Sequence, residues 1–176
     1  DEITAFTRVA VAAGISKVRI TGGEPLVRKG VTELVRMISA IEGITDLSMT
    51  TNGIFLSDYA GALAEAGLMR VNVSLDTLPP ESYARITRTD KFREVWEVIQ
   101  EALSVGLAPL KINVVTMKGI NDHEVRDFAR LTLCLPLAVR FIEYMPTGGG
   151  TWDPSQVFTT AAIMKTLEEE FGPLVP

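Results

Sequence analysis

Apolar residues recur along this chain with two different periods, and the two kinds of stretch alternate. Short stretches with a period of two predict strands, and they span residues 17–21, 46–51, 70–75, 110–116 and 139–144. Longer stretches with an apolar residue every three or four positions predict helices at 1–13, 31–41, 57–66, 80–86, 92–105, 121–133 and 160–171. Five strand–helix units of roughly 25 to 35 residues are typical of a parallel sheet. We therefore expect an α/β fold.

Polar residues occupy alternate positions near the ends of four of these strands. Such residues share one face of a strand, and here they are Arg19 and Thr21 with Gly23, Asn72, Ser74 and Asp76, Lys111 and Asn113, and Arg140 and Tyr144 with Ile142. A purely structural parallel strand is apolar on both faces. In a parallel barrel, ligands bind at the carboxyl ends of the strands. The pattern predicts one polar pocket in a parallel barrel with helices outside, although a doubly wound sheet also fits the order of elements.

Three cations belong to this polar pattern, namely Arg19, Lys111 and Arg140. A cluster of like charges away from water is costly unless an anion compensates it. The pocket is therefore expected to bind phosphate or carboxylate groups. The alternative is that each cation pairs with a carboxylate of the chain, and this alternative is strongest for Arg140, which lies close to Glu143 in the sequence.

The stretch from Val18 to Pro25 predicts a strand, a tight turn and the start of a helical segment. Gly22 and Gly23 remove two β-carbons from the turn, so that a ligand can approach the backbone closely. Arg19 and Glu24 place opposite charges beside that gap. A plain strand-to-helix turn would also explain two adjacent glycines.

Composition narrows the function classes. The chain has 176 residues, 47% of them hydrophobic, which suits a single domain spanning residues 1–176. A net charge of −5 argues against broad nucleic-acid binding, and no apolar stretch is long enough to span a membrane. The single cysteine, Cys134, excludes disulfides within the chain and favours a reducing cytoplasm. We expect Cys134 to be a small core residue on a helix.

Six short motifs recur in a known family. They are Arg19-Ile-Thr-Gly-Gly-Glu-Pro-Leu, Thr50-Thr-Asn-Gly, Asn72-Val-Ser-Leu-Asp, Lys111-Ile-Asn-Val-Val, Lys118-Gly-Ile-Asn-Asp and Arg140-Phe-Ile-Glu-Tyr-Met. In this order and spacing the chain resembles the molybdenum cofactor biosynthesis protein A family, the GTP 3′,8-cyclases of the radical S-adenosylmethionine (SAM) superfamily. The resemblance extends from about Val18 to Phe171, which is nearly the whole chain.

The resemblance implies a radical SAM barrel and a lyase. That family uses SAM and 4Fe–4S clusters to convert GTP to (8S)-3′,8-cyclo-7,8-dihydroguanosine 5′-triphosphate. By motif, Gly23, Ser74 and Met145 resemble the family's SAM contacts. The residues that resemble its GTP contacts are Arg19, Thr50 and Lys111. No catalytic residue and no metal ligand is carried over.

The cysteine motifs that hold the family's two clusters are not in this sequence. One is a CxxxCxxC loop after the first barrel strand, and the other lies near the C-terminus. We therefore expect a truncated barrel core that lacks the first strand and the C-terminal segment. Such a chain should form no cluster and should be inactive alone, since one thiolate cannot replace three.

Two alternatives remain open from the sequence. The first is another radical SAM enzyme, such as a peptide-modifying one. The second is a nucleotide- or phosphate-binding module without redox chemistry, which the missing cysteines favour. As partners we expect GTP as substrate, no nucleic acid, no membrane and a possible homodimer, since an exposed sheet edge can recruit a second chain.

Overall fold

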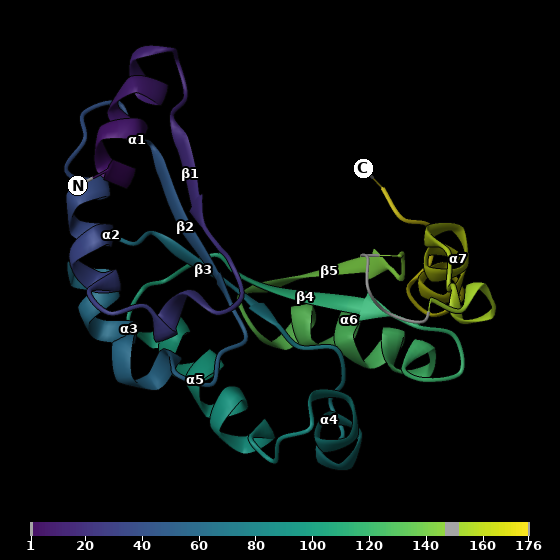
Figure 1. The fold of residues 1–176 in the computed structure, drawn as a ribbon. Helices are drawn as coiled ribbons and strands as arrows, with labels where there is room; N and C mark the ends of the chain where they lie inside the picture. The colour runs from purple at the N-terminus through teal and green to yellow at the C-terminus, as the bar shows by residue number, and fades with distance from the viewer. Residues whose placement is uncertain (1, 147–151, 176) are drawn as a thin grey trace. The chain divides into compact units, whose positions relative to one another are not determined.

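The computed structural model describes residues 2–146 and 152–175, and within these ranges strands and helices alternate (Figure 1). The strands are β1 (Lys17–Ile20), β2 (Asp46–Thr51), β3 (Arg70–Ser74), β4 (Leu110–Thr116) and β5 (Leu137–Glu143). The α-helices are α1 (Glu2–Ala12), α2 (Val31–Ser39), α3 (Leu56–Glu65), α4 (Pro80–Thr87), α5 (Phe92–Ser104), α6 (Val125–Cys134) and α7 (Thr160–Phe171). Short 3₁₀ turns are η1 (Pro25–Val27), η2 (Asp122–Glu124) and η3 (Pro154–Gln156).

The strand order is sequential, β1-β2-β3-β4-β5. This order confirms the prediction of a partial parallel barrel, because a doubly wound sheet would contain a reversal. No helix among the described residues is long and apolar enough to cross a membrane.

The chain divides into two compact units, each of which we describe by itself. The first unit comprises Asp1–Ser74 and Arg93–Leu110, and the second comprises Leu75–Phe92 and Lys111–Pro176. That the whole chain is a single domain stays a prediction.

In the first unit, β1, β2 and β3 pair in parallel, and the helices α1 to α3 lie on one side of them (Figure 1). Alternate residues of β2 and β3 form the core on the helix side, and they include Leu47, Met49, Val71 and Val73, all fully buried. Burying one such side chain contributes roughly 1.5–3 kcal/mol to folding. The core therefore fixes which face of the sheet the helices cover.

Helix α1 presents its predicted apolar face to solvent. The side chains of Phe6 and Val9 are 73% and 69% exposed, and Ile3 is also exposed. The buried residues of this helix are instead Thr4 and Thr7. Since β1 also stands at the end of the strand order, this side of the first unit combines a sheet edge with an exposed apolar helix face.

In the second unit, α6 and α7 pack against β5 and against each other. Phe128 of α6 and Phe141 of β5 meet edge to face, with ring centroids 6.4 Å apart. Across the two helices, Arg126 pairs with Glu169 and Arg130 with Glu170. Thr159 caps α7 by accepting a hydrogen bond from the amide of Ala162 at 3.2 Å.

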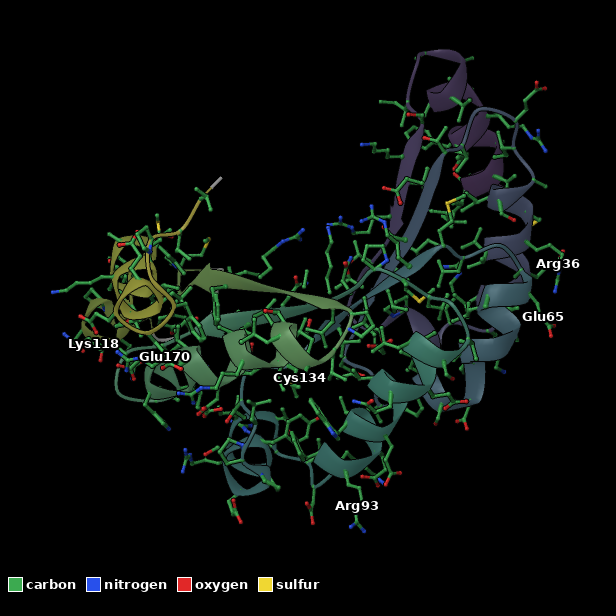
Figure 2. The ribbon with its side chains drawn as sticks, turned by 180° about the vertical axis from the view of Figure 1, so that it is seen from behind. Arg36, Glu65, Arg93, Lys118, Cys134 and Glu170 are labelled. Atoms are coloured by element: carbon green, nitrogen blue, oxygen red, sulfur yellow. The ribbon has the colours of Figure 1, made fainter. Side chains whose placement is uncertain are left out.

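Several local expectations were wrong. Cys134 is exposed at the end of α6 rather than in the core (Figure 2). Helix α3 begins at Leu56, ahead of the predicted start at residue 57, and the residue before it makes no side-chain cap. Strand β5 begins at Leu137, ahead of the predicted start at residue 139. Helix α6 ends at Cys134, and Pro136 lies between the two elements. Most of the loop expected at 147–154 lies outside the described residues.

We expect the chain to self-associate through the exposed face of α1 beside β1. Replacing Phe6 with Glu places a charge on that apolar face, and it should shift the sedimentation equilibrium toward monomer. The control is Leu133→Glu, since Leu133 is a similarly exposed apolar residue (72%) in the second unit. Wild-type chain that sediments as a monomer at all accessible concentrations would contradict this expectation.

Candidate functional site

One face of β1–β3 carries no helix, and its positions are mostly polar. The strand register sets Lys17 opposite Asp46, Arg19 opposite Ser48, and Thr50 opposite Asn72. Arg70 lies opposite Ser48 on the other side, and Ser74 comes two residues after Asn72 along β3. Charged residues of the helices, such as Arg36 and Glu65, lie on the opposite, outer side of the unit (Figure 2). The period-two pattern of the sequence therefore separates a face that packs against helices from a helix-free face. We call the helix-free face of β1–β3 the polar face.

The amino-terminal half of the polar face is positively charged. Lys17, Arg19 and Arg70 line a hollow of about 330 Å3, together with Asp46 and Ser48. The guanidinium of Arg70 donates to both carboxylate oxygens of Asp46, and this contact lowers the pKa of Asp46. The Nε of Arg19 lies 3.4 Å from the Ser48 hydroxyl. Because Asp46 is the hollow's one carboxylate, its three cations leave a net positive charge that suits an anion.

The carboxyl-terminal half of the polar face is neutral. The amide of Asn72 donates to the hydroxyl of Thr50 at 3.3 Å, which leaves the Thr50 hydroxyl proton available to another acceptor. Asn72 is only 1% exposed, and its Oδ1 atom accepts no hydrogen bond from the described residues. An unsatisfied buried carbonyl oxygen is costly, so this part of the face is suited to a ligand with a donor group.

The loop after β1 has open space in front of it. Gly22 and Gly23 are exposed, and a β-carbon added at either position would meet no atom within 4 Å. The two glycines are therefore not required by packing within the protein, which agrees with a loop whose backbone faces a ligand. Ser74 is also exposed at the end of β3.

The turn after β2 is held by its own side chains. The Thr51 hydroxyl accepts from the amide of Gly53 at 3.1 Å, and Asn52 Oδ1 accepts from the amide of Ile54 at 2.9 Å. Gly53 has a φ of +84°, and a β-carbon there would come within 3.2 Å of Val95 and Val73. Glycine is therefore required at this position, which keeps the end of β2 fixed next to Thr50.

In the second unit, Lys111 and Asn113 lie on the face of β4 opposite its buried residues, as the sequence pattern predicts. Asp76 accepts a hydrogen bond from the amide of Val115 in this strand at 2.8 Å. Burial raises the pKa of the Asp76 carboxyl, and the Val115 hydrogen bond only partly opposes that shift. Asp76 is thus engaged with the backbone of β4, and it is not the partner of a cation in any described ion pair.

Asn121 and Glu124 complete a buried network in the second unit. The Asn121 amide donates to the carbonyl oxygens of Asp76 at 2.6 Å and Val115 at 2.9 Å. Its Oδ1 accepts from the amide of Met117 at 2.6 Å. Asn121 stands directly before η2, but its side chain makes no cap hydrogen bond there. Its partners are instead backbone atoms just after β3, at Asp76, and at the end of β4, at Val115 and Met117.

The end of β5 differs from expectation. Glu143 was a candidate partner of Arg140, but its carboxylate accepts from the amide of Thr160 at the start of α7. Hydrogen bonds from Thr160 also lower the pKa of Glu143. Arg140 is exposed and has no ion pair among the described residues, and Met145 is 53% exposed. The alternative that Arg140 pairs with Glu143 is therefore wrong.

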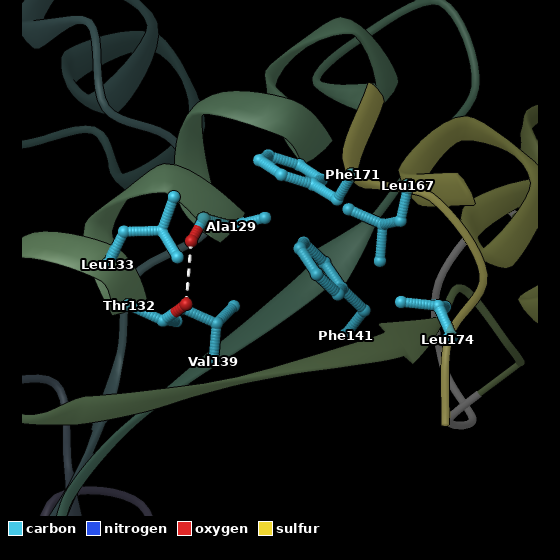
Figure 3. A pocket seen from close by; sticks show the side chains of 8 residues that line it. All are labelled: Ala129, Thr132, Leu133, Val139, Phe141, Leu167, Phe171 and Leu174. Atoms are coloured by element: carbon cyan, nitrogen blue, oxygen red, sulfur yellow. Dashed lines mark hydrogen bonds between the residues drawn. The ribbon is translucent and has the colours of Figure 1, made fainter. Parts of the chain in front are cut away.

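A second hollow, of about 360 Å3, lies in the second unit between α6, β5 and α7 (Figure 3). Apolar side chains dominate its lining, which consists of Ala129, Thr132, Leu133, Val139, Phe141, Leu167, Phe171 and Leu174. The Thr132 hydroxyl donates to the Ala129 carbonyl within the helix, so it is already engaged. With no charged side chain in its lining, this hollow does not suit an anionic ligand.

Each candidate site residue now has a position. Arg19, Gly23, Thr50 and Ser74 belong to the first unit, and Lys111 and Met145 belong to the second. That these residues line one ligand pocket stays a prediction. Sequence analysis missed Lys17, Ser48 and Arg70, although all three share the strand parity that identified Arg19 and Asn72. No group of three or more His, Cys, Asp or Glu residues in the described part of the chain could hold a metal ion.

The fold is that of a parallel barrel-type protein with polar strand ends. The family model of the radical SAM superfamily matches residues 1–132, and the chain belongs to this superfamily. Solved structures with a similar fold include methylornithine synthase, with a TM-score of 0.71 at 18% identity, covering 99% of this chain and 54% of that one. A radical SAM methyltransferase from Sphaerobacter thermophilus has a TM-score of 0.68 at 20% identity, covering 93% of this chain and 51% of that one.

Much closer relatives exist in sequence. The GTP 3′,8-cyclase of Pelotomaculum thermopropionicum is 50% identical over 177 residues, which covers 100% of this chain and 54% of the relative. The GTP 3′,8-cyclase of Moorella thermoacetica is 55% identical over 148 residues, which covers 84% of this chain and 46% of the relative. The resemblance to the GTP 3′,8-cyclases is thereby confirmed. The chain spans about half the length of these curated relatives.

The half-buried carboxyl of Asp76 leads us to expect a pH-dependent difference in stability. Because its folded-state pKa is raised, folding favours the neutral carboxyl, and ionisation above the unfolded value of about 3.9 costs stability. Asp76→Asn keeps an acceptor for the Val115 amide and removes the charge. This variant should match wild type near pH 3 and unfold at a higher temperature at pH 7, where a few degrees correspond to about 1 kcal/mol.

The measurement is thermal unfolding of both chains from pH 3 to pH 8. Asp90→Asn removes an exposed carboxylate of the same unit and serves as the control. A lower unfolding temperature for Asp76→Asn than for wild type at pH 7 would show that the charge itself is needed in this fold.

Proposed function

We propose that this chain is the central barrel portion of a GTP 3′,8-cyclase and contributes SAM and GTP contacts to that reaction. The observation that carries the proposal is the polar face of β1–β3. It combines a cationic hollow, an unsatisfied Asn72 oxygen and an open glycine loop, in a chain about half identical to cyclases along its whole length. Peptide substrates would not require the cationic hollow, so the peptide-modifying alternative has less support.

Gly23, Ser74 and Met145 are the proposed SAM contacts. The space in front of Gly23 lets the backbone of the loop approach the methionine part of SAM. The exposed Ser74 hydroxyl can donate to or accept from polar groups of SAM. Met145 offers an exposed thioether, which suits contact with the adenine ring.

Arg19, Thr50 and Lys111 are the proposed GTP contacts. In the first unit, Arg19 can place two donors on phosphate oxygens, and the Thr50 hydroxyl proton is available beside it on the polar face. In the second unit, Lys111 would supply a point charge from the half-buried face of β4. These residues bind and orient the triphosphate, and the position of the ribose follows from where the phosphates are held.

The residues of this chain do not fit an iron–sulfur cluster. Such a cluster needs several cysteine thiolates, whereas the sequence has one cysteine, which is exposed at the end of α6. We therefore assign to these residues only binding and orientation. The single cysteine favours the second candidate, which is a nucleotide-binding module without redox chemistry. A location in the cytoplasm is part of both proposals.

A chimeric enzyme separates the two candidates. The segment of the Pelotomaculum thermopropionicum cyclase that matches this chain is replaced by the chain itself, so that the relative's own flanks are retained. After anaerobic reconstitution, the chimera should form 5′-deoxyadenosine and the cyclised triphosphate from GTP. The Arg19→Ala chimera should bind SAM normally and lose most product formation. A folded, cluster-loaded chimera that binds nucleotide but forms neither product would favour the nucleotide-binding module.

The proposed GTP contacts predict a charge-dependent affinity of the isolated chain. Lys111→Ala should cost about 1–3 kcal/mol of GTP binding free energy, as expected for a charge-assisted hydrogen bond. Binding should weaken as salt rises, and it should barely discriminate GTP from ATP. Titration calorimetry measures all three effects. Lys118→Ala is the control, because Lys118 is an exposed lysine of the same unit (Figure 2). Equal GTP affinities for wild type and Lys111→Ala would exclude Lys111 as a contact.

A further inference from the structure

The side chain of Glu24 connects two loops of the first unit. Its Oε1 atom accepts from the Thr51 hydroxyl at 2.7 Å and from the amide of Leu26 at 3.0 Å. Its Oε2 atom accepts from the amide of Asn52 at 2.7 Å. One carboxylate thus joins the loop after β1 to the end of β2 through short, charge-assisted hydrogen bonds.

The loop after β1 has few other contacts on its glycine side. Gly22 and Gly23 are exposed and have no packing neighbours that a side chain would meet. The order of this loop therefore depends on its carboxyl-terminal end, where Pro25 and Leu26 are buried and Glu24 caps η1. On the other side of the link, Thr51 and Asn52 directly succeed Thr50 in the chain. Glu24 is placed where one side chain sets the position of Gly23 and of Thr50 together.

We propose that Glu24 is a positioning residue that holds the SAM-facing loop and the GTP-facing end of β2 in one fixed geometry. This inference rests on the proposed function, since it takes Gly23 and Thr50 as ligand contacts. Glu24 itself touches neither ligand. It acts through the hydrogen bonds that fix the backbone on both sides, so that loss of its carboxylate weakens two binding events at once.

The second unit contains the same arrangement at a different place. Glu124 Oε1 accepts from the Thr77 hydroxyl at 2.7 Å, and Oε2 accepts from the next amide, that of Leu78, at 2.7 Å. Glu124 and Thr77 are both buried, at 2% and 0% exposure. The two carboxylates therefore make matched pairs of hydrogen bonds, but only the Glu24 pair adjoins proposed ligand contacts on both sides. Glu124 supplies a control for the stability effect of losing such a pair.

The test compares Glu24→Gln with Glu124→Gln in the full 176-residue chain. In each variant the new NH₂ group cannot accept, so one backbone amide or hydroxyl loses its partner, and both variants should unfold at a lower temperature than wild type. Titration calorimetry with SAM and with GTP should show affinity losses of about tenfold for Glu24→Gln. Glu124→Gln should stay within about twofold of wild type for SAM. Equal SAM and GTP affinities for Glu24→Gln and wild type would overturn the proposal.

A second pair of variants is available should Glu24→Gln not fold. Thr51→Val keeps the shape of the side chain and removes the hydroxyl that donates to Glu24, whereas Thr51→Ser keeps the hydroxyl. Thr51→Val should lose affinity for both ligands, and Thr51→Ser should retain it. Similar affinities for the two variants would contradict a role of this hydrogen bond.

Amide hydrogen exchange distinguishes failure of this inference from failure of the proposed function. Without ligand, Glu24→Gln or Thr51→Val should raise the exchange rates of the Leu26 and Asn52 amides, which donate to Glu24, while Glu124→Gln should not. If wild type binds no SAM and the exchange rates rise as expected, the proposed function fails and the link between the loops stands. Unchanged exchange at Leu26 and Asn52 would overturn the link itself.

Discussion

The strands of the first unit are constrained to have two different faces. Helices cover one face, so most residues that point to it are apolar, and Leu47, Met49, Val71 and Val73 are fully buried there. The period of two then assigns the intervening residues to the other face. That face can be polar because neighbouring strands supply hydrogen-bond partners, as Asp46 does for the Arg70 guanidinium and Thr50 for the Asn72 amide nitrogen. The polar face depends on this constraint.

A ligand-binding face at the ends of parallel strands also requires loops with a fixed conformation. In each unit, a glutamate carboxylate accepts from a threonine hydroxyl and from the following amide. These contacts satisfy backbone donors that the end of the sheet would leave without partners. They also leave the glycines of the first loop open in front, where a ligand could approach the backbone. The loop ends can be rigid while the loop backbone stays open, because side-chain hydrogen bonds anchor the ends and no packing around the glycines is needed.

Local patterns predicted most of the fold. Four of the five strands begin at the predicted residue, since alternation and turn residues are encoded within a few positions. The same parity identified Arg19 and Asn72 as residues of the polar face, and Lys111 as a residue on the less buried face of β4. Periodicity shows which face of a helix is apolar, but not what packs against that face. It therefore could not predict that the apolar face of α1, with Phe6 and Val9, is exposed. Cys134 is exposed because the last turn of α6 extends beyond the packed part of the helix.

The contacts of Glu24, Asn121 and Glu124 could not be predicted from the sequence. Their partners lie 27, 45 and 47 residues away in Thr51, Asp76 and Thr77, and several of the acceptors or donors are backbone atoms that leave no trace in residue identity. A glutamate or asparagine after a strand is ordinary in loops, and nothing local distinguishes an anchor from a solvated side chain. Only the folded arrangement shows that these residues organise the strand ends.

The central claim is that the helix-free face of β1–β3 and its strand ends bind the ligands. The most direct measurement is amide chemical-shift mapping of the isotopically labelled chain during separate titrations with SAM and with GTP. We predict that SAM shifts the amides of Gly22, Gly23 and Ser74, and that GTP shifts those of Arg19 and Thr50. Shifts confined to the apolar hollow between α6 and α7, or to the outer faces of the helices, would contradict the account.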